Sequence, residues 1–228
     1  MIRVPRNFLT MHIKKRLQNL NRNWLAVIVG ETGSGKSFLA LKLGQLIDPE
    51  FNITKVVFSP SEFMELITSG TLRKGDCIVW DEAGVSVPAR EWYSISNKSI
   101  NYIAQTFRHD NLAVIFTVPN FDYIDSQLRK LFHTYIETQH INRIKKLCRV
   151  KWLNISYDGR MKKLYMKYPR VNIRGVDYKI KKVGIGLPTQ ELIDDYEKKK
   201  RKFTNKLKKS VQGNIKMAEE LQERRVSV

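Results

Sequence analysis

Short apolar runs alternate with amphipathic stretches along the first two thirds of the chain. The apolar runs predict buried strands, at 24–29, 55–58, 77–81, 112–117 and 132–138. The stretches between them have helical periodicity, at 36–47, 61–68, 92–107 and 122–131. A further short amphipathic helix is predicted before the first strand by Leu9, Ile13, Leu17 and Leu20. Such alternation predicts an α/β fold with a mainly parallel sheet covered on both faces.

The pattern changes after Gln139. Segments 147–157 and 161–170 read as two strands joined by a turn that contains Asp158-Gly159, a strong hairpin signal. Beyond Pro188, Thr189 can cap a helix with apolar residues on one face. We therefore expect three parts: a core at 1–138 that includes the N-terminal helix, a basic β-hairpin extension at 139–188, and a basic helical tail at 189–228.

The charge of the chain is unevenly distributed. The net charge is +19, and 42% of the residues are hydrophobic, which is enough for a core. Residues 1–138 hold 16 Lys/Arg against 13 Asp/Glu, whereas residues 139–228 hold 25 against 9. This asymmetry predicts a polyanion partner, and we expect DNA to bind through residues 139–228. The alternative is a lysine-rich tail that only keeps the protein soluble.

Cysteine content and hydropathy favour a soluble cytoplasmic protein. Cys77 and Cys148 are far apart in sequence and lack partners at metal-ligand spacing, so neither a disulfide nor a zinc site is expected. The longest apolar run, 24–29, is much shorter than the about 20 residues of a spanning helix. No signal-peptide pattern is visible at the N-terminus. We therefore expect no integral membrane segment.

A phosphate-binding loop follows the first apolar strand directly. The pattern G-x-x-x-x-G-K-[ST] is formed by Gly30, Glu31, Thr32, Gly33, Ser34, Gly35, Lys36 and Ser37, and Phe38 follows in the next helix. The glycines let successive backbone N–H groups face phosphate oxygens, and the helix adds the positive end of its dipole. We expect these nine residues to bind ATP, with Lys36 on the β- and γ-phosphates and Ser37 as a ligand to Mg²⁺.

Two carboxylates lie at the end of the apolar strand predicted at 77–81. Asp81 is expected at the carboxyl edge of a buried strand, beside the phosphate loop, where it can hold Mg²⁺. Glu82 is placed to orient and polarise the attacking water. Because such a group is needed only when water is the nucleophile, the pair indicates an ATP hydrolase and disfavours a nucleotide kinase.

Two arginines are candidates for an arginine finger. Arg108 belongs to a polar stretch, 105–111, that precedes the strand at 112–117 and can sense the γ-phosphate. Arg129 lies just before the strand at 132–138. Either could be given to a neighbouring subunit as a catalytic residue, and a surface salt bridge is the alternative for each.

These motifs together resemble the HerA/FtsK superfamily of motor ATPases, close to its archaeal and viral Zot-like branch. The resemblance is carried by the loop 30–37, the run 79–84 and the segments 105–120 and 124–132. It implies a RecA-like P-loop NTPase core, homo-oligomers such as hexamers with sites shared between subunits, and pumping of DNA. The superfamily often ends its sensor strand with glutamine, whereas this chain offers Thr117 or Asn120 instead.

The resemblance does not cover residues 139–228, and alternative functions stay open. The first hypothesis is an ATP-driven motor that moves DNA. The second is a Zot-like ATP-dependent assembly or export factor whose basic tail meets anionic lipid. A third is a slowly hydrolysing nucleotide switch. On the DNA hypothesis, truncation after Pro188 is predicted to weaken DNA binding and to leave nucleotide binding intact.

Overall fold

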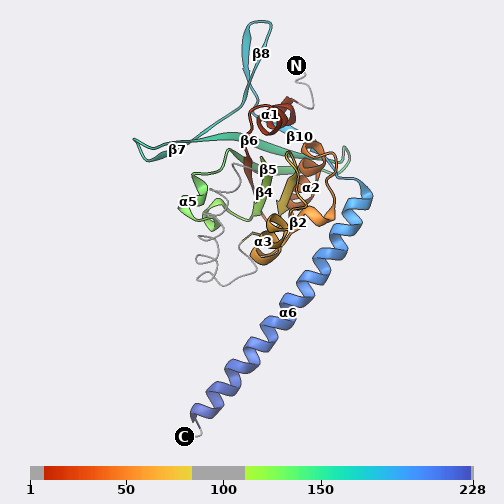
Figure 1. The fold of residues 1–228 in the computed structure, drawn as a ribbon, viewed down its shortest axis with the longest axis vertical. Helices are drawn as coiled ribbons and strands as arrows, with labels where there is room; N and C mark the ends of the chain where they lie inside the picture. Colours follow the sequence, from red (N-terminus) through yellow and green to blue (C-terminus); the bar gives the residue numbers. More distant parts are fainter. Residues whose placement is uncertain (1–7, 84–110, 227–228) are drawn as a thin grey trace.

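The computed structural model describes residues 8–83 and 111–226, and these residues form a mixed α/β fold around one large sheet (Figure 1). Within the described residues the sheet runs in the order β10-β6-β5-β1-β4-β3-β2, with β7 paired to β6. Its strands are β1 Trp24–Val29, β2 Val56–Val57, β3 Cys77–Trp80, β4 Ala113–Val118, β5 Thr134–Asn142, β6 Leu147–Asp158, β7 Lys163–Lys167 and β10 Val183–Gly186. A separate hairpin pairs β8 (Arg170–Ile173) with β9 (Val176–Lys179).

The helices cover both faces of this sheet. They are α1 Phe8–Gln18, α2 Lys36–Ile47, α3 Pro60–Thr68, α5 Ser126–Arg129 and α6 Gln190–Val226, with short 3₁₀ turns η1 Ile53–Lys55 and η2 Phe121–Tyr123. The helix expected at 92–107 lies outside the described residues. Two apolar clusters form the core, one on each face of the sheet. The predicted α/β class, with a mostly parallel sheet, a strand hairpin and a C-terminal helix, is confirmed.

Strand order brings the carboxyl ends of three strands together. β1 to β5 are parallel, and β4 lies between β1 and β3. In this register Val29 pairs with Val118 and Trp80 pairs with Phe116. The strands are buried on both faces, which is why they read as continuous apolar runs. The residues after β1 and β3 therefore meet at one edge of the sheet.

The strands after β5 extend the same sheet in the antiparallel sense. β5 continues to Asn142, so the boundary expected at 138 falls inside this strand. The single strand expected at 161–170 was wrong, because β7 ends at Lys167 and Arg170 begins a new hairpin. Pro169 lies between them and has no N–H to donate to a ladder, so pairing breaks at this position.

The helix expected at 122–131 is also interrupted. Asn120 accepts a hydrogen bond from the backbone N–H of Asp122, and Asp125 accepts one from the N–H of Gln127. Each acceptor starts a separate short turn, η2 and then α5. Side chains that cap two successive turns thus compete with a continuous helix.

α6 is the longest element, and most of it runs away from the sheet (Figure 1). Its first turns pack on the core, where Leu192 and Tyr196 are buried. Gln45 of α2 fixes the start of the helix, because its amide donates to Thr189 Oγ1 at 2.8 Å and accepts from Thr189 N at 3.2 Å. Among the helices that the structure describes, none is both long and apolar enough to cross a membrane.

Candidate nucleotide site

The phosphate loop connects β1 to α2 and requires its glycines. Gly33 and Gly35 have φ values of 79° and 89°, in the left-handed region that favours glycine. A Cβ on Gly30 would lie 1.9 Å from Thr138 Oγ1, so β5 leaves no room for a side chain there. Gly35 caps α2 without a side-chain hydrogen bond, which leaves the first N–H groups of the helix available to phosphate oxygens.

Lys36 folds back onto its own loop. Its Nζ donates to the carbonyl oxygens of Gly30 and Glu31, each at 2.8 Å. Partial burial lowers the pKa of Lys36, while the charges of Asp81 and Glu82 oppose that shift. The ammonium is therefore held by two backbone carbonyl oxygens, and phosphate oxygens can replace them as hydrogen-bond acceptors.

Asp81 is the buried acid of the site. Its side chain is 0% exposed, and it accepts hydrogen bonds from Ser37 Oγ at 3.1 Å and from Thr117 Oγ1 at 2.6 Å. Hydroxyl and carboxylate oxygens are the hard donors that Mg²⁺ prefers, so Ser37 and Asp81 fit this ion. The structure thus brings the two predicted metal ligands together from opposite sides of β4.

Thr117 occupies the position between the loop and the acids. Besides donating to Asp81, its hydroxyl accepts the backbone N–H of Glu82 at 2.9 Å. Asn120, the other candidate from sequence, instead caps η2 and is exposed. Of the two alternatives, Thr117 is the residue at the carboxylates, because β4 lies between β1 and β3.

Glu82 follows Asp81 and points to more open space. Its side chain is 42% exposed, and its backbone has a left-handed φ of 54°, which is uncommon for a non-glycine residue. The N–H bond to Thr117 holds this turn. Its carboxylate can therefore reach water beside the phosphate loop, and its catalytic role stays a prediction.

Two further residues of the site were not predicted from the sequence, and both lie on α6. The Tyr196 hydroxyl donates to Asp81 Oδ2 at 2.6 Å, and Lys200 Nζ lies 2.8 Å from Glu82 Oε1 and 3.4 Å from Asp81 Oδ2. Burial and the charge of Asp81 raise the pKa of Tyr196. Partial burial alone would lower the pKa of Lys200, but Asp81, Glu82 and Tyr196 outweigh it and raise the value. The available signal was their four-residue spacing on a helix with an apolar face.

A cavity of about 460 Å³ joins these elements. Its lining comes from the phosphate loop and α2 (Thr32, Gly33, Gly35, Lys36, Ser37 and Phe38), the strand ends (Glu82, Thr117, Val118, Pro119 and Ile141) and α6 (Tyr196, Glu197 and Lys200). Phe38 contacts Tyr196 edge-to-face with ring centroids 6.1 Å apart. Six of the nine predicted nucleotide-binding residues line this cavity, and the other three, Gly30, Glu31 and Ser34, form the loop behind it.

Of the two predicted arginines, Arg129 is not among the residues that line this cavity. Arg129 donates to Ile124 O at 2.7 Å and to Asp122 Oδ1 at 2.9 Å, and its guanidinium stacks over Phe121. Arg108 lies outside the described residues. Their roles as arginine fingers stay predictions, since a finger acts in a neighbouring subunit.

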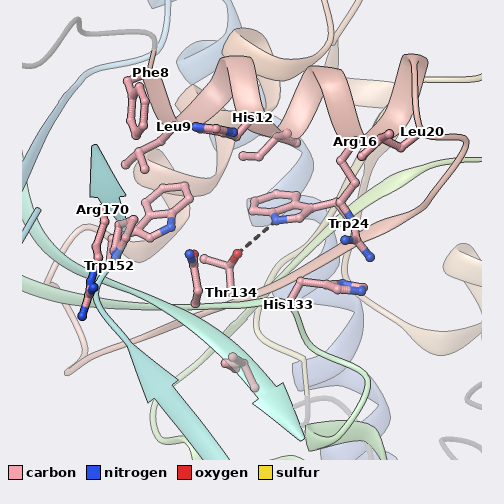
Figure 2. A pocket seen from close by; sticks show the side chains of 14 residues that line it. Phe8, Leu9, His12, Arg16, Leu20, Trp24, His133, Thr134, Trp152 and Arg170 are labelled. Carbon is pink, nitrogen blue, oxygen red and sulfur yellow. Dashed lines mark hydrogen bonds between the residues drawn. The ribbon is translucent and has the colours of Figure 1, made fainter. Parts of the chain in front are cut away.

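A second cavity, of about 440 Å³, lies at the opposite end of β1, where Trp24 begins the strand (Figure 2). Four of the polar side chains that line it have partners in the chain, those of Arg16, Trp24, His133 and Thr134. Trp24 Nε1 donates to Thr134 Oγ1 at 3.0 Å, Arg16 Nε donates to Asn23 O at 2.6 Å, and His133 Nδ1 accepts from Leu25 N at 3.1 Å. These bonds join α1 and β5 to β1, which indicates packing rather than chemistry.

His133 should make the fold sensitive to acid. Burial, with the nearby charge of Arg16, lowers the pKa of His133 from the ordinary 6.5 to about 4. The contribution of neutral His133 to the unfolding free energy is therefore complete above pH 6.5 and is lost as the pH falls towards 4. His133→Asn keeps an acceptor for Leu25 N–H without titrating. Between pH 6.5 and 4, the wild type should lose about 3 kcal/mol more unfolding free energy than the variant. Urea titrations at both pH values measure this, and parallel losses would contradict it.

Comparison with known protein families gives a match to the central part of the chain. The family model described as zonular occludens toxin (Zot) matches residues 45–185, more than half of the sequence. The chain belongs to the Zot family. The Zot match starts after the phosphate loop and includes Asp81, Glu82 and Thr117. Membership of the Zot family supports the assignment of the chain as a P-loop NTPase-type ATPase.

Two solved structures share weaker similarity with this Zot-family chain. One is the N-terminal domain of zonular occludens toxin from Neisseria meningitidis, with 16% identity, a TM-score of 0.40, and coverage of 64% of this chain and 93% of that one. The other belongs to the HORMA:CdnC:Trip13 complex of E. coli MS115-1, with 15% identity, a TM-score of 0.38, and coverage of 56% and 59%. No curated protein sequence matches the chain.

Proposed function

We propose that this protein is a magnesium-dependent ATPase of the HerA/FtsK type, in its archaeal and viral Zot-like branch, that binds and translocates DNA. The observation that carries the ATPase assignment is that Lys36, Ser37 and Glu82 line one cavity, while the buried Asp81 is bonded to Ser37 at its edge. These residues come from two strand ends, and the parallel sheet places both at its carboxyl edge, where α/β proteins bind ligands.

Each residue has a distinct task in hydrolysis. Lys36 and the free N–H groups of α2 bind the phosphates, and the left-handed glycines of the loop allow this approach. Ser37 and Asp81 would hold Mg²⁺, which would neutralise negative charge on the phosphates. Glu82, with its partly exposed carboxylate, accepts the proton of the attacking water.

The positive charge available for DNA lies mainly in the strands after β5. Residues 139–182 hold 14 Lys/Arg against 2 Asp/Glu, whereas residues 183–228 hold 11 against 7. Two exposed hairpins, β6–β7 and β8–β9, extend from the sheet (Figure 1) and carry much of this charge. Such a surface suits phosphate contacts that are independent of sequence.

Removal of charge from the β6–β7 hairpin should weaken DNA binding. Lys162, Lys163 and Lys167 are exposed, and their combined replacement by glutamine removes about three phosphate contacts. We expect lower affinity for duplex DNA and a salt dependence, d log K/d log[salt], that is shallower by about 2–3. Fluorescence anisotropy across a salt series measures both quantities.

A charge-matched control replaces Lys14, Lys15 and Lys74, which lie outside the basic strands, by glutamine. The control should bind DNA like the wild type. Equal losses in both triple variants would show that only net charge matters, and no loss in the hairpin variant would remove this hairpin from the DNA surface.

The second candidate function is a Zot-like ATP-dependent assembly or export factor that acts on protein or membrane partners. The match to the Zot family favours this second function. The matched region, residues 45–185, includes most of the basic strands. ATPase rates with added duplex DNA or with anionic phosphatidylserine vesicles separate the two functions. Stimulation by DNA alone supports the motor, whereas stimulation by vesicles alone supports the assembly factor.

The motor proposal includes a homo-oligomer, such as a hexamer, in which Arg108 or Arg129 reaches a neighbouring site. Within one chain Arg129 is bonded to Asp122, which is 76% exposed in its side chain, so that bond can exchange at a subunit contact. Mass photometry with and without ATP and DNA tests assembly. A monomer under all conditions would contradict this part of the proposal.

A further inference from the structure

The first turns of α6 form one wall of the nucleotide cavity, although a basic C-terminal segment would suggest a solvated tail. Phe203 stacks on Phe58 with ring centroids 5.1 Å apart, and Lys199 Nζ donates to the carbonyl oxygen of Val56. Together with the hydrogen bonds between Thr189 and Gln45 of α2, these contacts hold α6 against the core at both ends of its docked part. The helix therefore presents a fixed face to the phosphate loop.

Lys200 lies on that face with its ammonium among the catalytic groups. It is 2.8 Å from Glu82 Oε1, and its side chain is 27% exposed. Tyr196, one turn earlier, donates to Asp81, and Lys200 Nζ lies over the Tyr196 ring, 5.4 Å from its centroid. The long flexible stem of lysine allows the ammonium to move within the cavity while the helix stays in place.

Two ammonium groups, those of Lys36 and Lys200, face Asp81 and Glu82, and Glu197 also lines the cavity. A triphosphate brings more negative charge than one Mg²⁺ offsets, so a second ammonium gains a stronger partner in the γ-phosphate than in Glu82. Transfer of Lys200 from Glu82 to phosphate would also free this carboxylate for water. Charge-assisted bonds to phosphate are the strong class of hydrogen bond.

We propose that Lys200 is a catalytic residue that α6 supplies within the same chain, and that it binds the γ-phosphate of ATP in the cavity shared with Lys36. This inference rests on the proposed ATPase function and adds a residue to its site. It also makes α6 part of the enzyme, because the helix start is bonded to α2 and its docked turn lines the cavity.

The test is equilibrium binding of fluorescent ADP and of fluorescent β,γ-imido-ATP to the full chain with Mg²⁺. Lys200→Met should bind the ATP analogue about tenfold more weakly and ADP within about twofold of the wild type, since only the analogue has a γ-phosphate. Lys200→Arg keeps the charge and should retain most of the analogue affinity. Lys202→Met, an exposed lysine on the same helix, is the matched control and should match the wild type.

Two outcomes would overturn the inference separately from the proposed function. If the wild type prefers the ATP analogue and Lys200→Met keeps that preference, Lys200 does not bind the γ-phosphate. If Lys200→Met binds the analogue more tightly, the ammonium competes with Mg²⁺ instead of helping to bind phosphate. A wild type that binds neither nucleotide would overturn the ATPase assignment itself. Thermal unfolding of each variant confirms that the fold is intact.

Discussion

Glu82→Gln is expected to lower ATP turnover by about two to four orders of magnitude, because a positioned general base contributes a factor of that size. ATP binding should persist, because the phosphates are held by Lys36 and the loop, and Mg²⁺ by Ser37 and Asp81. The amide keeps the size of the carboxylate, and the N–H bond from residue 82 to Thr117 is unaffected. Single-turnover hydrolysis and equilibrium nucleotide binding measure the two effects separately.

The structure adds a complication that a control must address. Glutamine at position 82 also removes the negative partner of Lys200, which lies 2.8 Å away. Binding of ATP by Glu82→Gln should therefore be unchanged or tighter, because the lysine is released. Glu65→Gln, on the exposed face of α3, is the matched control and should turn over normally. Normal turnover in Glu82→Gln would remove Glu82 from its assigned role.

Lys36→Ala should weaken ATP binding by at least about thirtyfold, since loss of a charged hydrogen-bond donor from a buried pair costs about 2–5 kcal/mol. The structure suggests two sources for this loss. The variant lacks the phosphate contact, and it also lacks the bonds to Gly30 O and Glu31 O that hold the loop. Isothermal titration with ATP and Mg²⁺ measures the affinity.

Lys42→Ala lies on the same helix as Lys36 but outside the cavity, and it should bind ATP like the wild type. ATP affinity within about threefold of the wild type in Lys36→Ala would contradict the phosphate-loop assignment, because that loss is below about 1 kcal/mol. Thermal unfolding without nucleotide tests whether loss of the bonds from Lys36 to the loop carbonyls destabilises the protein. A clear drop in the midpoint of Lys36→Ala would show that its loop bonds stabilise the empty state.

The truncation expected from sequence needs revision. A cut after Pro188 would remove Tyr196 and Lys200, which contact Asp81 and Glu82. It would therefore disturb the nucleotide site together with the basic tail, and the two effects could not be separated. The hairpin substitutions at Lys162, Lys163 and Lys167 avoid this problem, because they leave α6 complete.

Local features of the chain were predictable because they depend on neighbours in sequence. β1 and α2 have the bounds that the sequence predicts, 24–29 and 36–47, since a buried apolar run and a helix after a glycine loop are short-range patterns. The shared edge of Ser37 and Asp81 was predictable as well. Any parallel sheet places the carboxyl ends of its strands at one edge, whereas their hydrogen bond also depends on the strand order.

Contacts that depend on strand order and helix docking were decided only by tertiary structure. Thr117 could not be preferred over Asn120 until β4 was placed between β1 and β3. Lys200 stands in a run of basic residues that are all alike by local pattern, and only the packing of Tyr196 and Phe203 turns it towards Asp81. Residues 81 and 200 are far apart in sequence, and periodicity encodes which face of a helix is apolar but not what that face covers.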